Sequence, residues 1–281
     1  MRILKVSWLV VLAMPLSMLI VGCEKGSNQD ENSPENTVPE NFVKKVVIEE
    51  VTGEWCAACP RGAGKLEELL QTYGDKVVVI SVHEGDPFER KDYYRELSTL
   101  QAAVSGNNTI SFPSVAIDRR LWNQGKALLL TLLDGWETPI QEQMGKSADA
   151  GLYIESNIAE NKLYITIYVA SKTAYNSLRL MVTVCENDIP ESAPGAQKGA
   201  NGDYVHQHVL REYPTGAQGE AITLEPGKVW KKTYVIDLTN TGYKTDKLEV
   251  GAYIRHHDPS NKNYTVVNAQ KTMAGQSSGW N

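Results

Sequence analysis

The sequence contains few of the residues that define specialised protein classes. Its 281 residues include 22 Gly, 12 Pro and 4 Cys, and 42% of them are hydrophobic. This composition excludes a collagen-like chain and wholesale disorder, and four cysteines are too few for a dense disulfide scaffold. The chain is therefore globular, and its length favours two domains with sizeable cores.

Basic charge is also scarce. The 28 basic and 34 acidic residues give a net charge of −6. The first 22 residues hold two basic residues and no acid, so the remaining 26 basic and 34 acidic residues give −8. With no basic stripe to bind phosphates, we expect no nucleic-acid partner.

Long hydrophobic runs are absent except at the start of the chain. Arg2 and Lys5 precede an apolar run from Trp8 to Val21, which is too short for a stable membrane span and predicts a signal peptide over residues 1–22. The end of this run resembles a bacterial lipobox, which implies cleavage before Cys23 and acylation of its thiol. An ordinary signal peptide with an incidental cysteine, or a single-pass anchor, are the alternatives.

The next stretch is polar, acidic and nearly free of apolar residues. It cannot bury enough surface to fold, so we expect residues 23–42 to be a flexible tether. Acyl chains on Cys23 would hold the protein on a membrane without spanning it.

The following region alternates strands and helices, which predicts an α/β sheet. Strands are expected at residues 43–52, 76–83 and 111–118, and helices at 65–70, 90–103 and, from composition, 126–133. The first strand leads directly into Cys56-Ala57-Ala58-Cys59, and a helix follows.

This placement of a Cys-x-x-Cys pair favours redox chemistry. At a helix start, unpaired backbone N–H groups and the helix dipole lower the pKa of Cys56, which makes it the attacking sulfur. Cys59 can then close onto it and release a mixed-disulfide partner. A purely structural disulfide is the open alternative in an exported chain.

Zinc and haem are poorly matched by these cysteines. A zinc site would need a second pair of ligands, and haem attachment would need His where Pro60 stands. We expect Cys185, at the end of an apolar strand, to be a buried and inert thiol. No cofactor is expected.

The segment Glu54–Pro60 with the later Phe112-Pro113 resembles the thioredoxin fold, over roughly residues 43–145. The resemblance implies that the peptide bond before Pro113 is cis, that Pro113 faces the cysteine pair, and that Trp55 and Pro113 shape a substrate groove. It also implies a buried proton acceptor six positions before the first cysteine.

That position is Glu50 in this chain. Apolar surroundings would raise its pKa and prepare it to take the Cys59 proton, whereas an exposed strand-edge carboxylate is the alternative. Because strand side chains alternate, Glu49 points to the other face, where we expect it to meet solvent.

The rest of the chain has short alternating strands separated by polar turns. We expect strands at residues 152–158, 162–170, 178–185, 205–211, 229–238, 247–255 and 264–271. They predict a β-sandwich of immunoglobulin-like or jelly-roll type. The domains expected are a thioredoxin-like domain (43–147), the β-sandwich (148–274) and a tail (275–281).

Two features of this second region bear on function. His206 and His208 would share one strand face and are weak candidates for metal ligands. The segment His256-His257-Asp258, after another strand, could supply further ligands. Paired surface histidines are the simpler interpretation. The long, turn-rich loop of residues 186–202 is either mobile or a binding loop.

Taken together, the lipobox, GEWCAACP, FPSVAIDR and Val205–Arg211 resemble the outer-membrane lipoprotein family of Bacteroidetes named for a twenty-eight-kilodalton protein. The resemblance implies a lipid-anchored outer-membrane location. The leading hypothesis is a membrane-anchored thiol–disulfide oxidoreductase acting on envelope protein thiols or disulfides through a Cys56–Cys59 pair. The alternative is a non-catalytic surface lipoprotein whose β-sandwich binds a protein or glycan. The sequence does not specify the oligomeric state.

Overall fold

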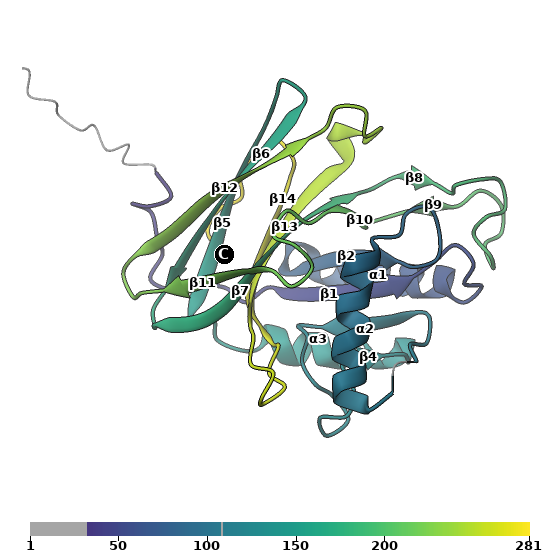
Figure 1. The fold of residues 1–281 in the computed structure, drawn as a ribbon, viewed down its shortest axis with the longest axis horizontal. Helices are drawn as coiled ribbons and strands as arrows, with labels where there is room; N and C mark the ends of the chain where they lie inside the picture. The colour runs from purple at the N-terminus through teal and green to yellow at the C-terminus, as the bar shows by residue number, and fades with distance from the viewer. Residues whose placement is uncertain (1–32, 108) are drawn as a thin grey trace, which may run out of the picture.

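The computed structural model describes residues 33–107 and 109–281, which form a mixed α/β protein made mostly of β-sheet with a few helices (Figure 1). The predicted signal peptide, residues 1–22, and the predicted lipidation site, Cys23, lie outside the described residues. Residues 33–42, the described part of the predicted tether, contact the folded body through Pro34 and Phe42.

The first part of the chain builds one end of a large sheet. Its strands are β1 (Val46–Thr52), β2 (Val77–His83), β3 (Ser114–Ile117) and β4 (Leu129–Leu130). Its helices are α1 (Cys59–Tyr73), α2 (Lys91–Ser105) and α3 (Glu137–Met144), and it also contains the 3-10 turns Gly74–Lys76 and Leu133–Gly135. Another 3-10 turn, Thr245–Lys247, lies in the second part of the chain. β1 pairs in parallel with β2 and antiparallel to β3.

Both faces of β1 and β2 are covered, which explains why every residue of these strands is buried. Alternate residues such as Val46 and Ile48 pack with α1 and α3, and the intervening Val47 and Val51 pack with α2. A strand buried on both faces becomes a nearly continuous apolar run, as the sequence of β1 shows.

The large sheet continues into the second part of the chain. The remaining strands are β5 (Ala150–Ala159), β6 (Lys162–Ser171), β7 (Tyr175–Glu186), β8 (Ile189–Pro190), β9 (Val205–His206), β10 (Val209–Glu212), β11 (Glu220–Leu224), β12 (Val229–Asp237), β13 (Leu248–His256) and β14 (Val266–Met273). The strand order is β14-β13-β7-β10-β2-β1-β3-β4, and β11 pairs with β7. The junction is the short parallel pair of β10 and β2, through Val209 and Ser81.

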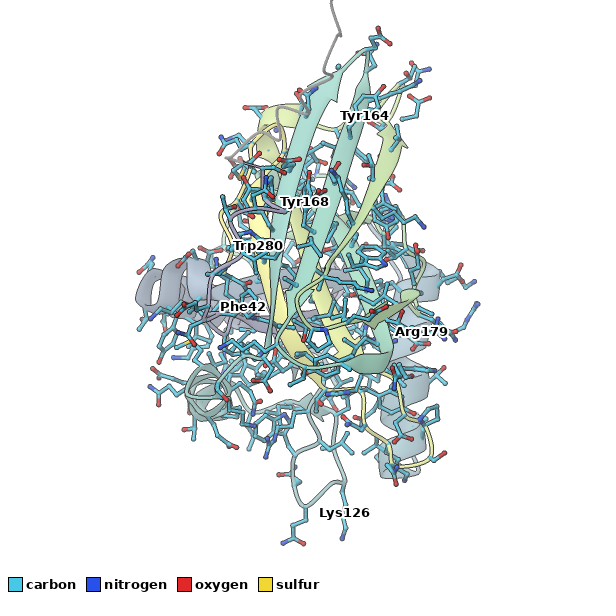
Figure 2. The ribbon with its side chains drawn as sticks, turned by 90° about the vertical axis from the view of Figure 1, so that its left-hand side faces the viewer. Phe42, Lys126, Tyr164, Tyr168, Arg179 and Trp280 are labelled. Atoms are coloured by element: carbon cyan, nitrogen blue, oxygen red, sulfur yellow. A yellow bond between two sulfur atoms is a disulfide. The ribbon has the colours of Figure 1, made fainter. Side chains whose placement is uncertain are left out.

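A second, three-stranded sheet in the order β12-β6-β5 packs on the β7–β13 end of the large sheet (Figure 1). The core between these sheets is aliphatic and draws on both, with Leu152 and Ile165 from the small sheet and Val182 and Val250 from the large one. On the other face of the small sheet, Phe42, Tyr168 and Trp280 gather (Figure 2), with the Phe42 and Trp280 ring centroids 6.2 Å apart. The Trp280 indole donates a hydrogen bond to the Pro34 carbonyl at 3.1 Å, which fixes residues 33–42 to this face.

A fully buried ion pair lies where α2, β1 and β13 meet. Arg119 donates from Nε and Nη2 to the two carboxylate oxygens of Glu49, each at 2.7 Å. The Tyr93 and Tyr253 hydroxyls donate to Glu49 Oε1 at 2.7 and 3.0 Å. Burial alone would raise the pKa of Glu49, but the Arg119 charge and these hydrogen bonds hold it below its usual value. The expectation that Glu49 meets solvent is wrong, because α2 covers the face to which it points.

Most predicted elements are present, with three corrections. The helix expected at residues 126–133 is wrong, since this stretch contains β4 and the start of a 3-10 turn. The single strand expected at 205–211 is broken into β9 and β10 because His208 has a positive φ of 56°. Strands β8 and β11 and helix α3 were missed. Cys185 is a free, buried cysteine, as predicted.

We expect Glu49→Gln to lower the free energy of unfolding by about 3–5 kcal/mol, because it leaves the Arg119 charge buried without its counter-ion. Urea unfolding at pH 7 measures this. Glu68→Gln is the control, since its ion pair with Lys65 lies at the surface and its loss should leave the unfolding midpoint unchanged. Equal midpoints for Glu49→Gln and the unmodified chain would contradict the expectation.

Candidate functional site

The predicted cysteine pair forms a disulfide at the start of α1. Cys56 and Cys59 are bonded, with their Cα atoms 5.4 Å apart, and Cys59 is the first residue of the helix. No acidic residue lies in the first turn of α1, and no side chain of the described residues caps its N-terminus. The positive end of the helix dipole therefore acts on the disulfide without a neighbouring carboxylate of the helix to oppose it.

The two cysteines of the disulfide are almost inaccessible to solvent, whereas the residue before them, Trp55, is exposed. Cys56 and Cys59 are 5% and 2% exposed, and Trp55 is 47% exposed. The Trp55 indole donates to the Glu84 carbonyl at 2.7 Å, and its ring lies 4.9 Å from that of Phe112. Trp55 and the segment before Pro113 thus form one aromatic surface beside the pair.

Pro113 and Glu50 converge on the first turn of α1. The Phe112–Pro113 peptide bond is cis. A Cβ added to Gly62 would lie 2.8 Å from the Pro113 ring and 3.2 Å from Glu50 Oε1, so only a glycine lets the helix pack so closely. The structure therefore brings Pro113, Glu50 and the cysteine-bearing turn together, as the resemblance implied.

Glu50 is buried, not exposed at a strand edge. Burial raises its pKa to about 7, and the nearby charge of Glu67 adds to this rise. Ser81 Oγ donates a hydrogen bond to Glu50 Oε2 at 3.0 Å, which acts in the opposite direction and lowers the pKa. Among the residues that the structure describes, its Oε1 has no hydrogen-bond partner. A carboxyl group with a free oxygen and a pKa near neutrality is suited to accept and release a proton at physiological pH.

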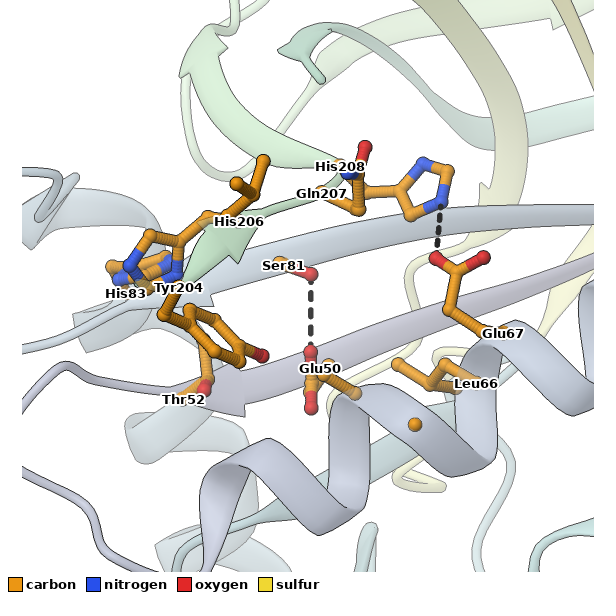
Figure 3. Close-up of a pocket in the computed structure, with 13 residues that line it drawn as sticks. Glu50, Thr52, Leu66, Glu67, Ser81, His83, Tyr204, His206, Gln207 and His208 are labelled. Atoms are coloured by element: carbon orange, nitrogen blue, oxygen red, sulfur yellow. Dashed lines mark hydrogen bonds and ion pairs between the residues drawn. The ribbon is translucent and has the colours of Figure 1, made fainter. Parts of the chain in front are cut away.

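Glu50 lines a cavity of about 220 Å³ (Figure 3). One wall comes from α1, including Leu66 and Glu67, and another from β1 and β2. The third wall, with Tyr204, comes from residues 204–208 of the second part of the chain. Sequence reasoning missed Tyr204, Ser81 and His83 as neighbours of Glu50, because nothing local in the sequence indicates that these segments meet.

His206 and His208 line this cavity but point to different neighbours (Figure 3). His206 contacts His83, with ring centroids 5.0 Å apart, and lies 3.4 Å from the Glu54 carboxylate. His208 points toward Glu67, at 3.8 Å. The expectation of a shared strand face is wrong, because the strand is interrupted between the two residues.

Burial lowers the pKa of both His206 and His208 to about 4, so both imidazoles are neutral at pH 7. Neutral imidazoles can bind metals. However, no group of three or more His, Cys, Asp or Glu side chains with metal-binding geometry occurs in residues 33–107 and 109–281.

The long loop between β8 and β9 lies against the cysteine loop. Gln197 Nε2 donates to the Cys56 carbonyl at 3.1 Å, and the Lys198 amide donates to the Glu54 carbonyl at 2.7 Å. The Ser192 amide donates to Glu54 Oε1 at 2.7 Å. The sequence left open whether this loop is mobile or binds something, and the structure gives it an intramolecular contact.

A family model described as "Outer membrane protein Omp28" matches residues 102–278. The match covers more than half of the chain, so the protein belongs to this outer-membrane family, and it is an outer-membrane protein. Cys56 and Cys59 precede the matched residues, and Pro113 lies within them. A search of curated proteins finds no significant match.

Two solved structures share the fold. HBP35 of Porphyromonas gingivalis superposes with a TM-score of 0.68 at 24% identity, over 83% of this chain and 76% of that one. A protein from Agrobacterium tumefaciens gives a TM-score of 0.52 at 16% identity, over 83% of this chain and 96% of that one. A domain of the outer membrane lipoprotein Omp28 from Porphyromonas gingivalis also matches, with a TM-score of 0.31 and 14% identity, over 46% of this chain and 97% of that one.

Within the described part of the chain, no helix is both long and apolar enough to cross a bilayer.

We expect the stability contributed by protonated Glu50 to be present in full below pH 4.5 and to be lost as the pH rises through about 7, because the unfolded chain ionises first. Glu50→Gln cannot ionise, so relative to the unmodified chain it should gain about 3 kcal/mol between pH 4 and pH 8. Urea unfolding across this range measures the gain, with Glu68→Gln as the exposed control. Parallel pH curves for Glu50→Gln and the unmodified chain would contradict the expectation.

Proposed function

We propose that this outer-membrane protein is a thiol–disulfide oxidoreductase, built from a thioredoxin-like region (43–147) and a β-sandwich (148–274), that acts through Cys56 and Cys59. The observation that carries the proposal is the disulfide at the N-terminus of α1, with Glu50 buried behind the same turn and one of its oxygens unpartnered. These are the groups that disulfide exchange needs, namely a sulfur with a stabilised thiolate and a proton acceptor.

In the reduced protein, the Cys56 thiolate attacks a substrate disulfide. One substrate sulfur leaves as a thiolate, which takes a proton from water, and a mixed disulfide forms on Cys56. Cys59 loses its proton to Glu50 and attacks Cys56, which restores the Cys56–Cys59 disulfide. The second substrate sulfur leaves as a thiolate and takes up the proton that Glu50 holds. The substrate gains two electrons and the protein loses two, so an envelope partner protein must supply them for the next cycle.

The burial of both sulfurs favours a second candidate, in which the disulfide is structural and the β-sandwich binds a surface ligand. Reduction potential separates the two candidates. A value between roughly −120 and −270 mV is typical of working oxidoreductases, and a value below about −300 mV is typical of a structural disulfide. Glutathione titration with mass spectrometry measures it.

We expect Cys56→Ser to abolish reduction of insulin disulfides, because it removes the attacking sulfur, and Cys59→Ser to accumulate mixed disulfides with substrates, because nothing resolves them. Cys185→Ala is the matched control, since Cys185 is buried and its pKa is strongly raised by burial. Full activity in Cys56→Ser would refute the proposal.

The proposed anchor is an acyl group on Cys23. We expect Cys23→Ser to move the protein from the outer-membrane fraction to the soluble fraction, because no acyl chain can then form on this thiol. Fractionation followed by immunoblotting measures this, with Cys185→Ala again as control. Retention of Cys23→Ser in the membrane at the level of the unmodified chain would exclude the lipid anchor.

A further inference from the structure

Residues 187–202, here named the covering segment, lie over the loop of residues 54–57 that carries Cys56. The two sulfur-bearing residues are nearly buried, although Trp55 beside them is half exposed. Ala57 and Ala58 are exposed as well. The cysteine loop thus has one open side, at Trp55, Ala57 and Ala58, and one side closed by the covering segment.

The contacts of the covering segment are directed at the backbone of the cysteine loop. Gln197, itself buried, donates from its amide nitrogen to the Cys56 carbonyl, and the Lys198 amide donates to the Glu54 carbonyl. The Glu54 carboxylate in turn accepts hydrogen bonds from both the amide and the hydroxyl of Ser192. Two backbone acceptors of the cysteine loop are therefore already used.

Gly199 brings the two chains into direct contact. A Cβ at this position would lie 2.0 Å from the Ala57 carbonyl oxygen, and its φ is +78°. No side chain fits there. Any residue larger than glycine must push the covering segment away from the cysteine loop.

Residues 190–202 of the covering segment can separate from this site without disturbing the core, while Ile189 at its base stays packed with Phe88 and Val209. Its base is held by the pairing of Ile189–Pro190 with Val205–His206. None of residues 190–202, all of them described, belongs to a hydrophobic core cluster. Segments fixed by hydrogen bonds and few apolar contacts open at low free energy.

Small thiols and protein thiols can both act as reductants of a disulfide, and they differ in the space that they need to approach it. Reduction of the Cys56–Cys59 disulfide takes two thiol groups, which become one disulfide while both cysteines become thiols. A small thiol needs only a line of approach to one sulfur. A protein thiol also brings its own backbone, which must fit between the open side of the cysteine loop at Trp55 and the covering segment on its other side.

We infer that the covering segment determines which thiols reach the disulfide. In its docked position it admits small thiols and excludes protein thiols, which react only after it lifts. This substrate selection rests on the proposed function, because it concerns the same disulfide.

Single-turnover reduction of the oxidised full-length chain tests the inference, with dithiothreitol and reduced, unfolded ribonuclease A as the two reductants. Acid-quenched samples are alkylated and analysed by mass spectrometry. Gln197→Ala removes the hydrogen bond to Cys56, and Gly199→Val displaces the segment sterically. Lys198→Ala is the control, because the Lys198 side chain is exposed and donates only to the Gly195 carbonyl within the segment.

Both variants should react about tenfold faster with ribonuclease A and within about threefold of the unmodified rate with dithiothreitol, and the control should match the unmodified chain with both. Circular dichroism and thermal melting verify that each variant is folded. Equal acceleration with both reductants in the two variants, or none with ribonuclease A, overturns the inference.

The experiment distinguishes failure of the proposed function from failure of the inference about the covering segment. If the unmodified chain does not turn over insulin but the variants still accelerate selectively with ribonuclease A, the covering segment acts as inferred on a non-catalytic disulfide. If turnover is present and selectivity is absent, only the inference is overturned.

Discussion

The Glu49–Arg119 ion pair is the interaction on which the rest of the structure depends. Both side chains are fully buried, and Tyr93 of α2 and Tyr253 of β13 stabilise the Glu49 charge by donating hydrogen bonds to its carboxylate. The strand that carries Glu49, the helix that covers it and a strand from the far part of the chain must therefore all be in place together. A buried pair of this kind adds little net stability compared with apolar residues, whereas loss of one partner alone is strongly destabilising.

The same arrangement explains how the two parts of the chain share one site. The large sheet runs through both of them, and the single pair of β10 with β2 places residues 204–208 beside Glu50. The environment of Glu50 is thus set partly by side chains more than 120 residues away in sequence. Glu50 and the second region are therefore not independent, and changes at Tyr204 or His208 act on the same cavity.

Local patterns predicted the elements well where one physical rule dominated. The β-branched run of β1 and the Cys-x-x-Cys at a helix start were readable because they depend on neighbours in sequence. Strand alternation placed Glu49 and Glu50 on opposite faces correctly, but alternation alone does not say that a helix covers the second face. His206 and His208 were misplaced for a different reason: a left-handed residue breaks the strand, and no glycine or asparagine marks it. The contact of the covering segment with the cysteine loop is a long-range pairing that no local pattern encodes.

The attachment of residues 33–42 to the small sheet also limits how the protein can stand on a membrane. Trp280 donates a hydrogen bond to the Pro34 carbonyl, and the first described part of the chain lies on the side of the small sheet, away from α1 (Figure 1). Only nine residues lie between an acylated Cys23 and Ser33, and the ten residue steps that join them span at most ~35 Å when fully extended. The small sheet would then face the bilayer at close range, and the disulfide would be presented outward, toward partners that approach from the aqueous side.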